Sequence, residues 1–584
     1  MVEDVEGKGE SKAEIAKRNS RHLRGTIAEA LASEATHFEG GDKGLLKFHG
    51  TYQQDDRDLR HENRKKGLEE AYQFMIRCAI PGGVVTADQY LGLDALSDQY
   101  GNRTLRITTR QGFQLHGVIK KNLKATIAGI NHTLLTTISA CGDVERNVMT
   151  CPAPLYDEAH VTLRRIAREI AVQLRPATRA YHEIWLDGEK VLSTEQEEPF
   201  YGDVYLPRKF KTAIALADDN CVDVYNDDAG LIAIVKGGKL AGFNVLVGGG
   251  MGMTHGKADT VARLAEPVGF VNVEHGVETI RTMVAIFRDY GNRADRRHAR
   301  IKYVINERGI EWFRDEFRRR ALFDLHEWRP IPRPSFHDHL GRNPQGNGKW
   351  FYGVFIENGR IADAAVKIKT ALREIVRRFR PGLALTASQN ILLTGLAERD
   401  LDGVERMLSD HGVKGVAQLS AARRFSMACP ALPTCGLAMA ESERIMPDVV
   451  SMFEGELTAL GLRDVPITLR MTGCPNGCAR PYTADIAFVG RRPDVYQVYV
   501  GGGMQGDRVV DLYAADVTVQ DLIPALHPLL SAWAKDRRAD ESLSDFYQRA
   551  LQRDKPRQGI TGREDPTRDL VQLKINVRPQ EAGA

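Results

Sequence analysis

The stretch "LRITTRQGFQLHG", residues 105–117, has a counterpart in "LALTASQNILLTG", residues 383–395. These two stretches are 278 residues apart, and at the same offset "TCPAP" around Cys151 matches "ACPAL" around Cys429. Further along, "VLVGGGM" in the first half is matched by "VYVGGGM" in the second. Three matches in the same order indicate an internal duplication. We expect the two copies to pack about a pseudo-twofold axis.

The patterns around these repeats mix short strands with amphipathic helices. "LRITT", "LALTA", "NVLVGGG" and "QVYVGGG" are typical of short strands, two of them ending at glycines. "AAVKIKTALREIVRRF", residues 364–379, carries apolar residues, Val366 among them, at helical spacing. The mixture predicts α+β or α/β layers, and the length predicts two to four domains. The polar, charge-rich residues up to about 70 are expected to form an extended N-terminal arm.

Composition and charge limit the classes of function. The 584 residues include 80 basic and 77 acidic ones, so bulk charge gives no reason to expect nucleic acid or an acidic membrane as a partner. The charged N-terminal sequence lacks the apolar core of a secretory signal. No run of about eighteen apolar residues predicts a membrane span, so we expect a cytoplasmic protein. One basic stretch, expected to form a solvated or interdomain helical face, contains Arg293, Arg296, Arg297 and Arg300.

Half of the cysteines form two motifs close together. "CPALPTC" contains Cys429 and Cys435, and "MTGCPNGCARP" contains Cys474 and Cys478. Clustered thiols in a reducing compartment hold a metal more often than they form disulfides. Neither spacing is that of a zinc knuckle, so an iron–sulfur cluster is favoured over zinc, with plain structural cysteines third. The scattered cysteines are expected to be small buried hydrophobic groups: Cys78, Cys141, Cys151 and Cys221.

These motifs closely resemble the cluster signature of the siroheme-dependent sulfite and nitrite reductases. The resemblance continues through "FHGTYQQDDRD", "RTLRITTRQGFQLHG", "YLPRKFKT" and "FNVLVGGGM". It is greatest with the NADPH-linked assimilatory sulfite reductases. It implies a [4Fe-4S] cluster held by Cys429, Cys435, Cys474 and Cys478, with the sulfur of Cys478 bridging to the iron of siroheme. Cys151, which lacks a partner equivalent to Cys435, is not expected to be a cluster ligand.

With the resemblance, we expect an α+β protein of three domains with an N-terminal arm, in an internally duplicated, pseudo-twofold architecture. The predicted units are an arm at 1–70, paired ferredoxin-like half-domains at 71–139 and 345–415, a first siroheme-binding α/β domain at 140–344, and a second α/β domain with the cluster at 416–584.

Siroheme carries eight carboxylates, so its pocket needs cationic and hydrogen-bonding groups on rigid elements. The first repeat supplies such groups at alternate positions, which a single strand would place on one face. An ordinary sheet exterior would explain them equally well, and the resemblance favours contacts to siroheme. The predicted contacts are Arg106, Thr108, Arg110, Gln114 and His116, with Asn147, Gln389 and Asn390 at the periphery.

Sulfite is a small anion, and its six-electron reduction to sulfide consumes protons and releases water. The site therefore needs fixed positive charge and groups that pass protons. The resemblance assigns these roles to Arg77, Arg146, Lys209 and Lys211. The two lysines lie two positions apart and would share a strand face. A solvated basic strand would account for them without the resemblance.

The sequence shows no flavin or NADPH site, because "GGGMGM" and "GGGMQG" lack the G-x-G-x-x-G pattern. Their glycines are expected to let backbone approach a large ligand. Electrons are therefore expected from a partner, a flavoprotein with FAD and FMN that oxidises NADPH, in a hetero-oligomer that serves cysteine biosynthesis. The alternatives are ferredoxin-dependent sulfite reductase, then ferredoxin-dependent nitrite reductase. From another class, a zinc-stabilised binding protein would explain the cysteines but neither the cationic strand nor the repeat.

Overall fold

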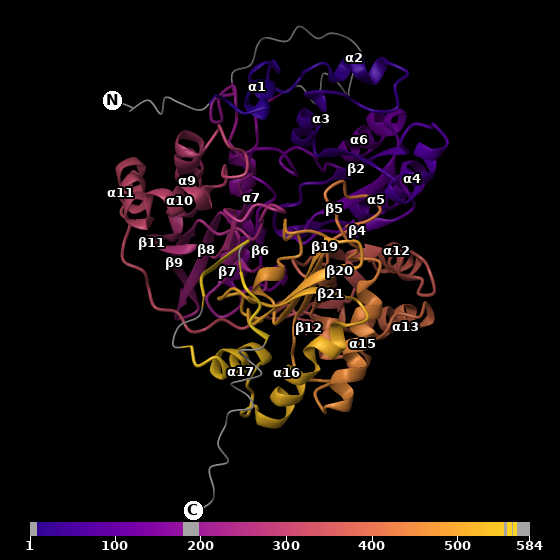
Figure 1. The fold of residues 1–584 in the computed structure, drawn as a ribbon, viewed down its shortest axis with the longest axis vertical. Coiled ribbons are helices and arrows are strands. Elements are labelled where there is room, and N and C mark those ends of the chain that lie inside the picture. Colours follow the sequence, from indigo (N-terminus) through magenta and orange to yellow (C-terminus); the bar gives the residue numbers. More distant parts are fainter. Residues whose placement is uncertain (1–8, 179–197, 554–556, 563, 569–584) are drawn as a thin grey trace, which may run out of the picture.

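The computed structural model describes residues 9–178, 198–553, 557–562 and 564–568. These residues form four five-stranded sheets and one two-stranded sheet, with helices packed around them (Figure 1). The small sheet pairs β10 (Val261–Arg263) with β22 (Gly559–Thr561). Within the described ranges, no helix has both the length and the apolar character needed to cross a membrane.

The first sheet is built from the first copy and completed by the second. Its strands run in the order β1-β2-β5-β4-β14, and all neighbours are antiparallel. Its last strand, β14, comes from the second half of the chain. The strands and the two helices packed against the sheet are β1 (Thr51–Asp55), β2 (Tyr72–Arg77), β4 (Leu105–Ile107), β5 (Phe113–Val118), β14 (Arg360–Ile361), α5 (Ala87–Tyr100) and α6 (Leu123–His132).

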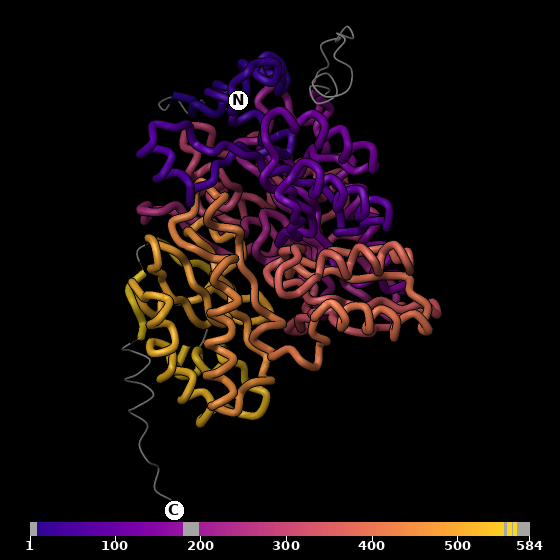
Figure 2. Tube along the Cα trace, turned by 90° about the vertical axis from the view of Figure 1, so that its right-hand side faces the viewer, coloured from indigo at the N-terminus to yellow at the C-terminus, as the bar shows by residue number. Residues whose placement is uncertain are grey.

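The second sheet makes the reciprocal exchange. Its order is β12-β13-β16-β15-β3, and β3 comes from the first half of the chain. Because each half-domain lends the other a strand, the two form one intertwined unit; Figure 2 shows the middle of the chain, in salmon, beside the indigo and orange segments. The elements are β3 (Val84–Val85), β12 (Gly341–Pro344), β13 (Trp350–Val354), β15 (Gly382–Leu385), β16 (Ile391–Leu396), α12 (Ile368–Phe379) and α13 (Leu401–Asp410).

The amphipathic pattern at 364–379 forms helix α12, as predicted, but the helix begins only at Ile368. Its apolar positions, among them Leu372 and Ile375, are buried at helical spacing. Val366 precedes the helix and is exposed, so its predicted place on the apolar face is wrong.

The remaining two large sheets have the same topology. One has the order β11-β9-β8-β7-β6 and the other β17-β18-β19-β20-β21. In each, three strands are parallel and two further strands are added antiparallel. The strands of the first are β6 (Met149–Thr150), β7 (Thr212–Leu216), β8 (Ala229–Lys236), β9 (Lys239–Val247) and β11 (Glu266–Asn272), with α7 (Glu158–Gln173) and α9 (Gly276–Tyr290) packed on it.

The second of these sheets has its own hydrophobic core between strands and helices. In Figure 1 its helices α15 and α16 lie below strands β20 and β21. The elements are β17 (Ser426–Ala428), β18 (Leu469–Thr472), β19 (Ile486–Arg492), β20 (Val495–Val500), β21 (Asp511–Thr518), α15 (Met446–Ala459), α16 (Leu522–Asp536) and α17 (Leu543–Ala550).

The first repeat is a hairpin and not a single strand. Strands β4 and β5 pair antiparallel, with Arg106 opposite Gln114. In the turn, Gln111 has a φ of 51°, and its counterpart Gln389 in the second copy has 67°. The prediction of one strand carrying five residues on one face is therefore wrong. The register still places Arg106 across from Gln114, and His116, two residues further along β5, shares the face of Gln114.

The N-terminal segment is also not extended. It forms the helices α1 (Lys12–Arg18), α2 (Ile27–Ala32), α3 (Asp42–Leu45) and α4 (Arg57–Lys65), and contributes β1 to the first sheet. Buried Lys17 donates to the carbonyl of Leu206 at 2.7 Å, which ties α1 to the first α/β unit.

The basic stretch at 292–300 forms turns and no helix. Its arginines make ion pairs with other elements: Arg293 with Glu14 at 2.6 Å and Arg296 with Asp143 at 2.8 Å. The helical geometry expected here is wrong. The Arg293–Glu14 pair links this stretch to helix α1, whereas Arg296 pairs within the first α/β unit. Two further helices follow this stretch, α10 (Ile301–Arg308) and α11 (Ile310–Arg320).

Candidate active site between the two halves

The four cysteines of the C-terminal motifs lie in two neighbouring loops. Cys429 follows β17 and Cys474 follows β18, and these strands are adjacent and parallel. Cys429 and Cys474 are buried, Cys435 is half-buried and Cys478 is exposed. The two loops therefore meet at the carboxyl ends of two strands, where ligands of open α/β sheets commonly bind.

These thiols influence one another electrostatically. Burial raises the pKa of the Cys474 thiol to about 11, and the neighbouring charge of Cys478 contributes to the rise. The same two causes raise the pKa values of Cys429 and Cys435. Thiols that oppose each other's ionisation become stable as thiolates when a metal centre supplies positive charge.

The turn between Cys474 and Cys478 is packed against the glycine-rich loop after β9. Gly477 has a φ of +65°, and a Cβ there would lie 3.0 Å from the carbonyl oxygen of Met251. The backbone N–H of Met253 donates to the carbonyl of Pro475 at 2.9 Å. The glycine-rich loop thus approaches the backbone of the cysteine loop closely, and Gly477 is required at this contact.

The arginines predicted to bind the substrate have no acidic partner in the described residues. Arg77, at the end of β2, donates to the sulfur of Cys141 at 3.1 Å. With the Gln114 amide oxygen turned toward it, Arg77 also donates to Gln114 at 2.6 and 2.9 Å. Arg146 donates through Nε to the carbonyl of Gly142 at 2.7 Å. Both guanidinium groups are held in place while their charge stays uncompensated.

Lys209 and Lys211 lie on the segment that leads into β7, on either side of the buried Phe210. Across the described ranges, neither ammonium group makes an ion pair or a hydrogen bond. Burial lowers the pKa of Lys211 to about 8, against the opposing charge of Asp227. Burial and then the charge of Lys211 lower the pKa of Lys209 well below its ordinary value. Unpaired charges in such a place are costly unless an anion binds there.

The cations and the thiols border the same space. The charge of Cys478 acts on the guanidinium of Arg77. Thr109, in the turn between β4 and β5, donates its hydroxyl to the carbonyl of Cys478 at 3.0 Å. Charge on the Arg146 side chain also acts on Lys209. Residues far apart in the sequence therefore converge on one interface between the two copies.

Several of the predicted siroheme contacts are bonded to other groups of the protein. Arg106 pairs with Glu443 at 2.7 Å and donates to the carbonyl of Ala428 at 2.8 Å. Arg110 pairs with Asp227 at 2.7 Å. Two others bond the main chain: the Thr108 hydroxyl accepts from the N–H of residues 110 and 112, and the Asn147 amide bonds the main chain of residue 80.

Some of the predicted siroheme contacts, Arg110 among them, also retain buried polar atoms that have no hydrogen-bonding partner in the described residues. They are Arg110 Nε, His116 Nδ1, Gln389 Oε1 and Asn390 Nδ2. Buried polar groups in proteins are usually hydrogen-bonded, so unmatched atoms that gather near one interface fit a polar ligand. Both donors and acceptors are present, as a cofactor with many carboxylates and ring substituents requires.

Two domain families match this chain. The family described as "Nitrite and sulphite reductase 4Fe-4S domain" matches residues 166–323 and 422–550. The family described as "Nitrite/Sulfite reductase ferredoxin-like half domain" matches residues 66–132 and 343–411. Each model matches twice, once in each copy of the duplication.

Similar proteins cover nearly the whole chain. A Staphylococcus saprophyticus protein named sulfite reductase [NADPH] hemoprotein beta-component is 45% identical over 91% of this chain and 94% of its own. A Myxococcus xanthus protein of the same name is 46% identical over 92% and 96%. The chain belongs to the nitrite and sulfite reductase family. The chain is also similar to the solved structure of Mycobacterium tuberculosis NirA. The TM-score is 0.73 at 25% sequence identity, over 92% of this chain and 96% of the NirA chain.

For a member of this family, the thiols suit the cluster that the matched domain description names. Four cysteines in two facing loops are the usual donor set of a [4Fe-4S] cluster. Cys435 is further oriented because its N–H donates to the carbonyl of Ala431 at 2.8 Å. The N–H of Gly473 donates to the sulfur of Cys429 at 3.4 Å, a contact that stabilises a thiolate.

Two arginines that support the cysteine loops were not assigned from the sequence. Arg57 donates to the carbonyl of Cys435 at 3.0 Å and lies in the quoted motif "TYQQDDRD". Arg480, within the second cysteine motif, pairs with Asp223 and donates to the carbonyl of Thr109 at 2.8 Å. For Arg480 the available signal was a charged residue inside a cysteine motif, whereas Arg57 lies in a motif without cysteines. Neither motif gave an indication of the partner.

The scattered cysteines are all buried, as predicted. Three of them nevertheless have polar surroundings: Cys141 contacts Arg77, Cys151 faces the imidazole of His339, and Cys221 lies within 4.8 Å of Asp219 and His339. The expectation that all four behave as plain hydrophobic groups is wrong for these three.

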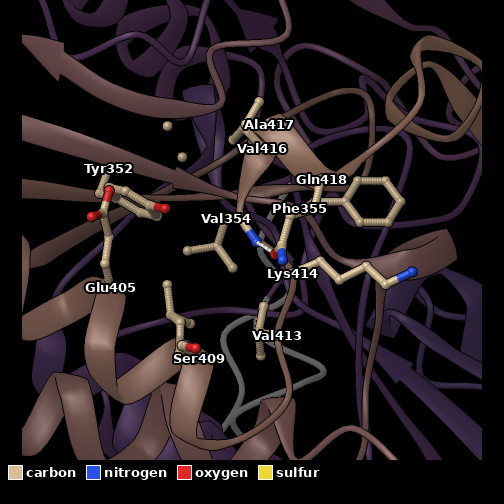
Figure 3. Close-up of a pocket in the computed structure, with 14 residues that line it drawn as sticks. Tyr352, Val354, Phe355, Glu405, Ser409, Val413, Lys414, Val416, Ala417 and Gln418 are labelled. Atoms are coloured by element: carbon tan, nitrogen blue, oxygen red, sulfur yellow. Dashed lines mark hydrogen bonds between the residues drawn. The ribbon is translucent and has the colours of Figure 1, made fainter. Parts of the chain in front are cut away.

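A cavity of 380 Å³ opens elsewhere, in the second half-domain (Figure 3). Tyr352, Glu405 and Lys414 are among its lining residues, which come from β13, α13 and the loop that follows α13. None of the predicted site residues lines this cavity, so it does not coincide with the interface of cations and thiols.

Proposed function

We propose that this chain is the hemoprotein component of an NADPH-linked sulfite reductase, which reduces sulfite to sulfide. One observation carries the proposal: four cations without acidic partners in the described residues converge beside the cysteine loops, with Cys478 acting on Arg77. An anionic substrate and an electron-transfer centre would meet there. The names of similar proteins from Staphylococcus saprophyticus and Myxococcus xanthus support sulfite as that anion.

The residue roles in this proposal rest on the family resemblance, and the donor chemistry of the side chains supports them. Cys429, Cys435, Cys474 and Cys478 would hold the [4Fe-4S] cluster, with Cys478, the exposed one of the four, as the link to siroheme. When bound, these groups would store and deliver the electrons of the reduction. Hydrogen bonds and charge for siroheme would come from Arg106, Thr108, Arg110, Gln114, His116, Asn147, Gln389 and Asn390.

The four cations bind the substrate, and the two lysines among them can also supply protons. Arg77 and Arg146 supply fixed charge, because a guanidinium stays protonated at any physiological pH. Lys211, with a pKa of about 8, is mostly protonated near neutral pH and can still give up its proton. Lys209, whose pKa burial and the charge of Lys211 lower well below its ordinary value, gains its proton most readily when an anion lies beside it.

The electrons come from a separate flavoprotein subunit that oxidises NADPH, which makes the working enzyme a cytoplasmic hetero-oligomer. The term "hemoprotein beta-component" in the names of the relatives supports a second subunit. This subunit supplies the FAD and FMN chemistry for which the sequence motifs of this chain offer no site.

Turnover by the purified holoprotein tests the proposal. With chemically reduced methyl viologen as donor, we expect sulfide from sulfite and a higher kcat/KM for sulfite than for nitrite. The physiological donor is then compared in two arms, NADPH with the flavoprotein against reduced ferredoxin. Failure to form sulfide, or a clear preference for nitrite, would overturn the assignment. Activity with ferredoxin alone would retain sulfite reduction and remove the flavoprotein partner.

A further inference from the structure

A second group of metal-binding side chains lies in the first α/β unit, away from the cysteine motifs. Cys151, Asp219, Cys221 and His339 each direct one donor atom into the same small space, and these atoms all lie within 4.8 Å of one another. Cys151, Asp219 and Cys221 are only 2%, 5% and 4% exposed, and the His339 side chain is 12% exposed. These four residues form the mixed-donor cluster, which shares no residue with the site between the two halves.

The distances within the mixed-donor cluster match a tetrahedral ion. Zinc bonds of about 2.3 Å to sulfur and about 2.0–2.1 Å to nitrogen and oxygen place the ligand atoms about 3.3–3.8 Å apart at tetrahedral angles. Cys151 Sγ lies 3.6 Å from His339 Nε2 and 3.9 Å from Asp219 Oδ2. His339 Nε2 lies 3.5 Å from Asp219 Oδ2. Three of the donor atoms thus lie at or near these separations, and the fourth, Cys221 Sγ, lies within 4.8 Å of each of them. Small side-chain movements would bring all four donors around one ion.

The surrounding contacts position the ligands in advance. Asp219 Oδ1 accepts from the backbone N–H of Cys221 at 3.1 Å and of His337 at 3.2 Å. Oδ2 faces Cys151 and His339, and it also lies 3.4 Å from Nδ1 of the exposed His337. The loop that carries Asp219 is joined to the linker that carries His339, because the N–H of Asn220 donates to the carbonyl of Ser335 at 2.9 Å. Ligands held by such outer contacts bind metal more tightly than flexible ones.

The duplication relates this cluster to the iron–sulfur cysteines. In the first unit Met149 pairs with Ala213 across two parallel strands, and in the second Met427 pairs with Arg470. Two residues beyond each methionine come Cys151 and Cys429. Eight residues beyond Ala213 and Arg470 come Cys221 and Cys478. Both units therefore place a pair of thiols at the carboxyl ends of the same two strands.

We propose that Cys151, Asp219, Cys221 and His339 bind one zinc ion in a closed, structural site. Two thiolates, a carboxylate and an imidazole complete four-coordination and leave no open position for substrate. The mixed donors and single-ion distances favour zinc over an iron–sulfur cluster. The two thiol protons are released on binding. The ion anchors the linker between the two halves to the first α/β unit. This proposal is independent of the reaction catalysed at the interface.

The metal content and zinc absorption spectrum of the holoprotein test the site. We expect about one zinc per chain in addition to the iron, and X-ray absorption at the zinc edge should show two sulfur ligands at about 2.3 Å with two lighter ones. His339→Ala should lose the zinc and keep its iron. The matched control is His337→Ala, because His337 lies beside Asp219 but is 63% exposed and outside the cluster; it should keep both metals.

Zinc can also occupy empty iron–sulfur sites, and Cys478→Ser separates the two cases. Zinc that persists in Cys478→Ser and disappears in His339→Ala supports the proposal. Zinc that disappears in Cys478→Ser and persists in His339→Ala would place the ion at the iron–sulfur cysteines and overturn it. Wild-type holoprotein without zinc after reduction and incubation with zinc chloride would overturn it as well. A disulfide between Cys151 and Cys221, detected by mass spectrometry of the unreduced holoprotein, would have the same effect. These wild-type measurements do not depend on a variant that folds.

Discussion

Substitutions of Lys211 separate the charge of this side chain from its proton. Burial, opposed by Asp227, lowers the pKa of Lys211 to about 8. At pH 7 such a group is about nine-tenths protonated, and transfer of its proton to a bound oxyanion costs little free energy. In Lys211→Arg the charge stays, but a side chain with a pKa above ~12 cannot donate a proton. In Lys211→Met both charge and proton are lost.

The two variants should therefore lose turnover for different reasons. Loss of a general acid lowers the turnover of sulfite by roughly 10²-fold or more in both. The KM for sulfite should change little in Lys211→Arg and rise by roughly tenfold in Lys211→Met, which corresponds to about 1.4 kcal/mol for one lost cation. The protonated lysine is the active form, so the activity of the parent should fall as the pH rises through about 8. The residual activity of Lys211→Arg should lack this decline.

Steady-state kinetics with reduced methyl viologen between about pH 6 and pH 9.5 measures these quantities without the partner subunit. Lys239→Met is the matched control, because Lys239 lies at the exposed start of β9 in the same sheet. It should behave as the parent does. Full turnover in Lys211→Met would remove Lys211 from the mechanism. Full turnover in Lys211→Arg alone would show that its charge suffices and that the protons come from another group.

Three further variants test other parts of the structure. Cys478→Ser should lose the cluster and the siroheme absorption, because serine is a poor ligand for iron–sulfur centres; a normal cofactor spectrum would contradict this. Cys151→Ala should keep the iron of the parent, whereas a loss of about four irons per chain would make Cys151 a cluster ligand. Burial raises the pKa of Glu443, but the charges of Arg360 and Arg106 outweigh this effect and lower the pKa to about 2. Glu443→Gln should therefore reduce the free energy of unfolding at pH 7 by about 3 kcal/mol. This difference should shrink as the pH falls from about 4.5 toward 2, since a lowered carboxyl pKa stabilises only above its unfolded value; a difference independent of pH would contradict the ion pair.

The internal duplication allowed the general architecture to be predicted from the sequence. Several short elements could not be predicted in this way. The strands exchanged between half-domains, Val84–Val85 and Arg360–Ile361, have two residues each and are too short to show a period. The hairpin turn at Gln111 depends on a positive φ that glutamine adopts only rarely, so residue type gave no signal. Patterns that extend over several residues were predictable, and tertiary pairings of short segments were not.

The candidate site shows the same division. Cys474 and Cys478 could be singled out from the sequence because their spacing is local, and their role as cluster ligands stays a prediction that the family resemblance implies. The partner of Arg106 was not, since Glu443 lies in another domain and nothing in either segment indicates the pairing. His339 stands in a Pro/Gly-rich linker, where a histidine by itself carries no information about distant cysteines. Ligand sets assembled from remote segments become visible only when the backbone brings their donors together.

The two α/β units share one sheet topology but carry different sets of potential metal ligands. In both, thiols follow two parallel strands, which offer a fixed place for ligands at their carboxyl ends. In the second unit further cysteines in the same loops make the donors all sulfur, which suits an iron–sulfur cluster. In the first unit Asp219 and His339 complete the pair, and harder donors favour a single zinc ion without redox chemistry. The strand β7 that leads to this proposed zinc site begins directly after Lys209 and Lys211. An ion bound at one end of β7 would therefore restrict the movement of this strand. It would fix the proposed substrate-binding lysines at the other end of β7 relative to the cysteine loops across the interface.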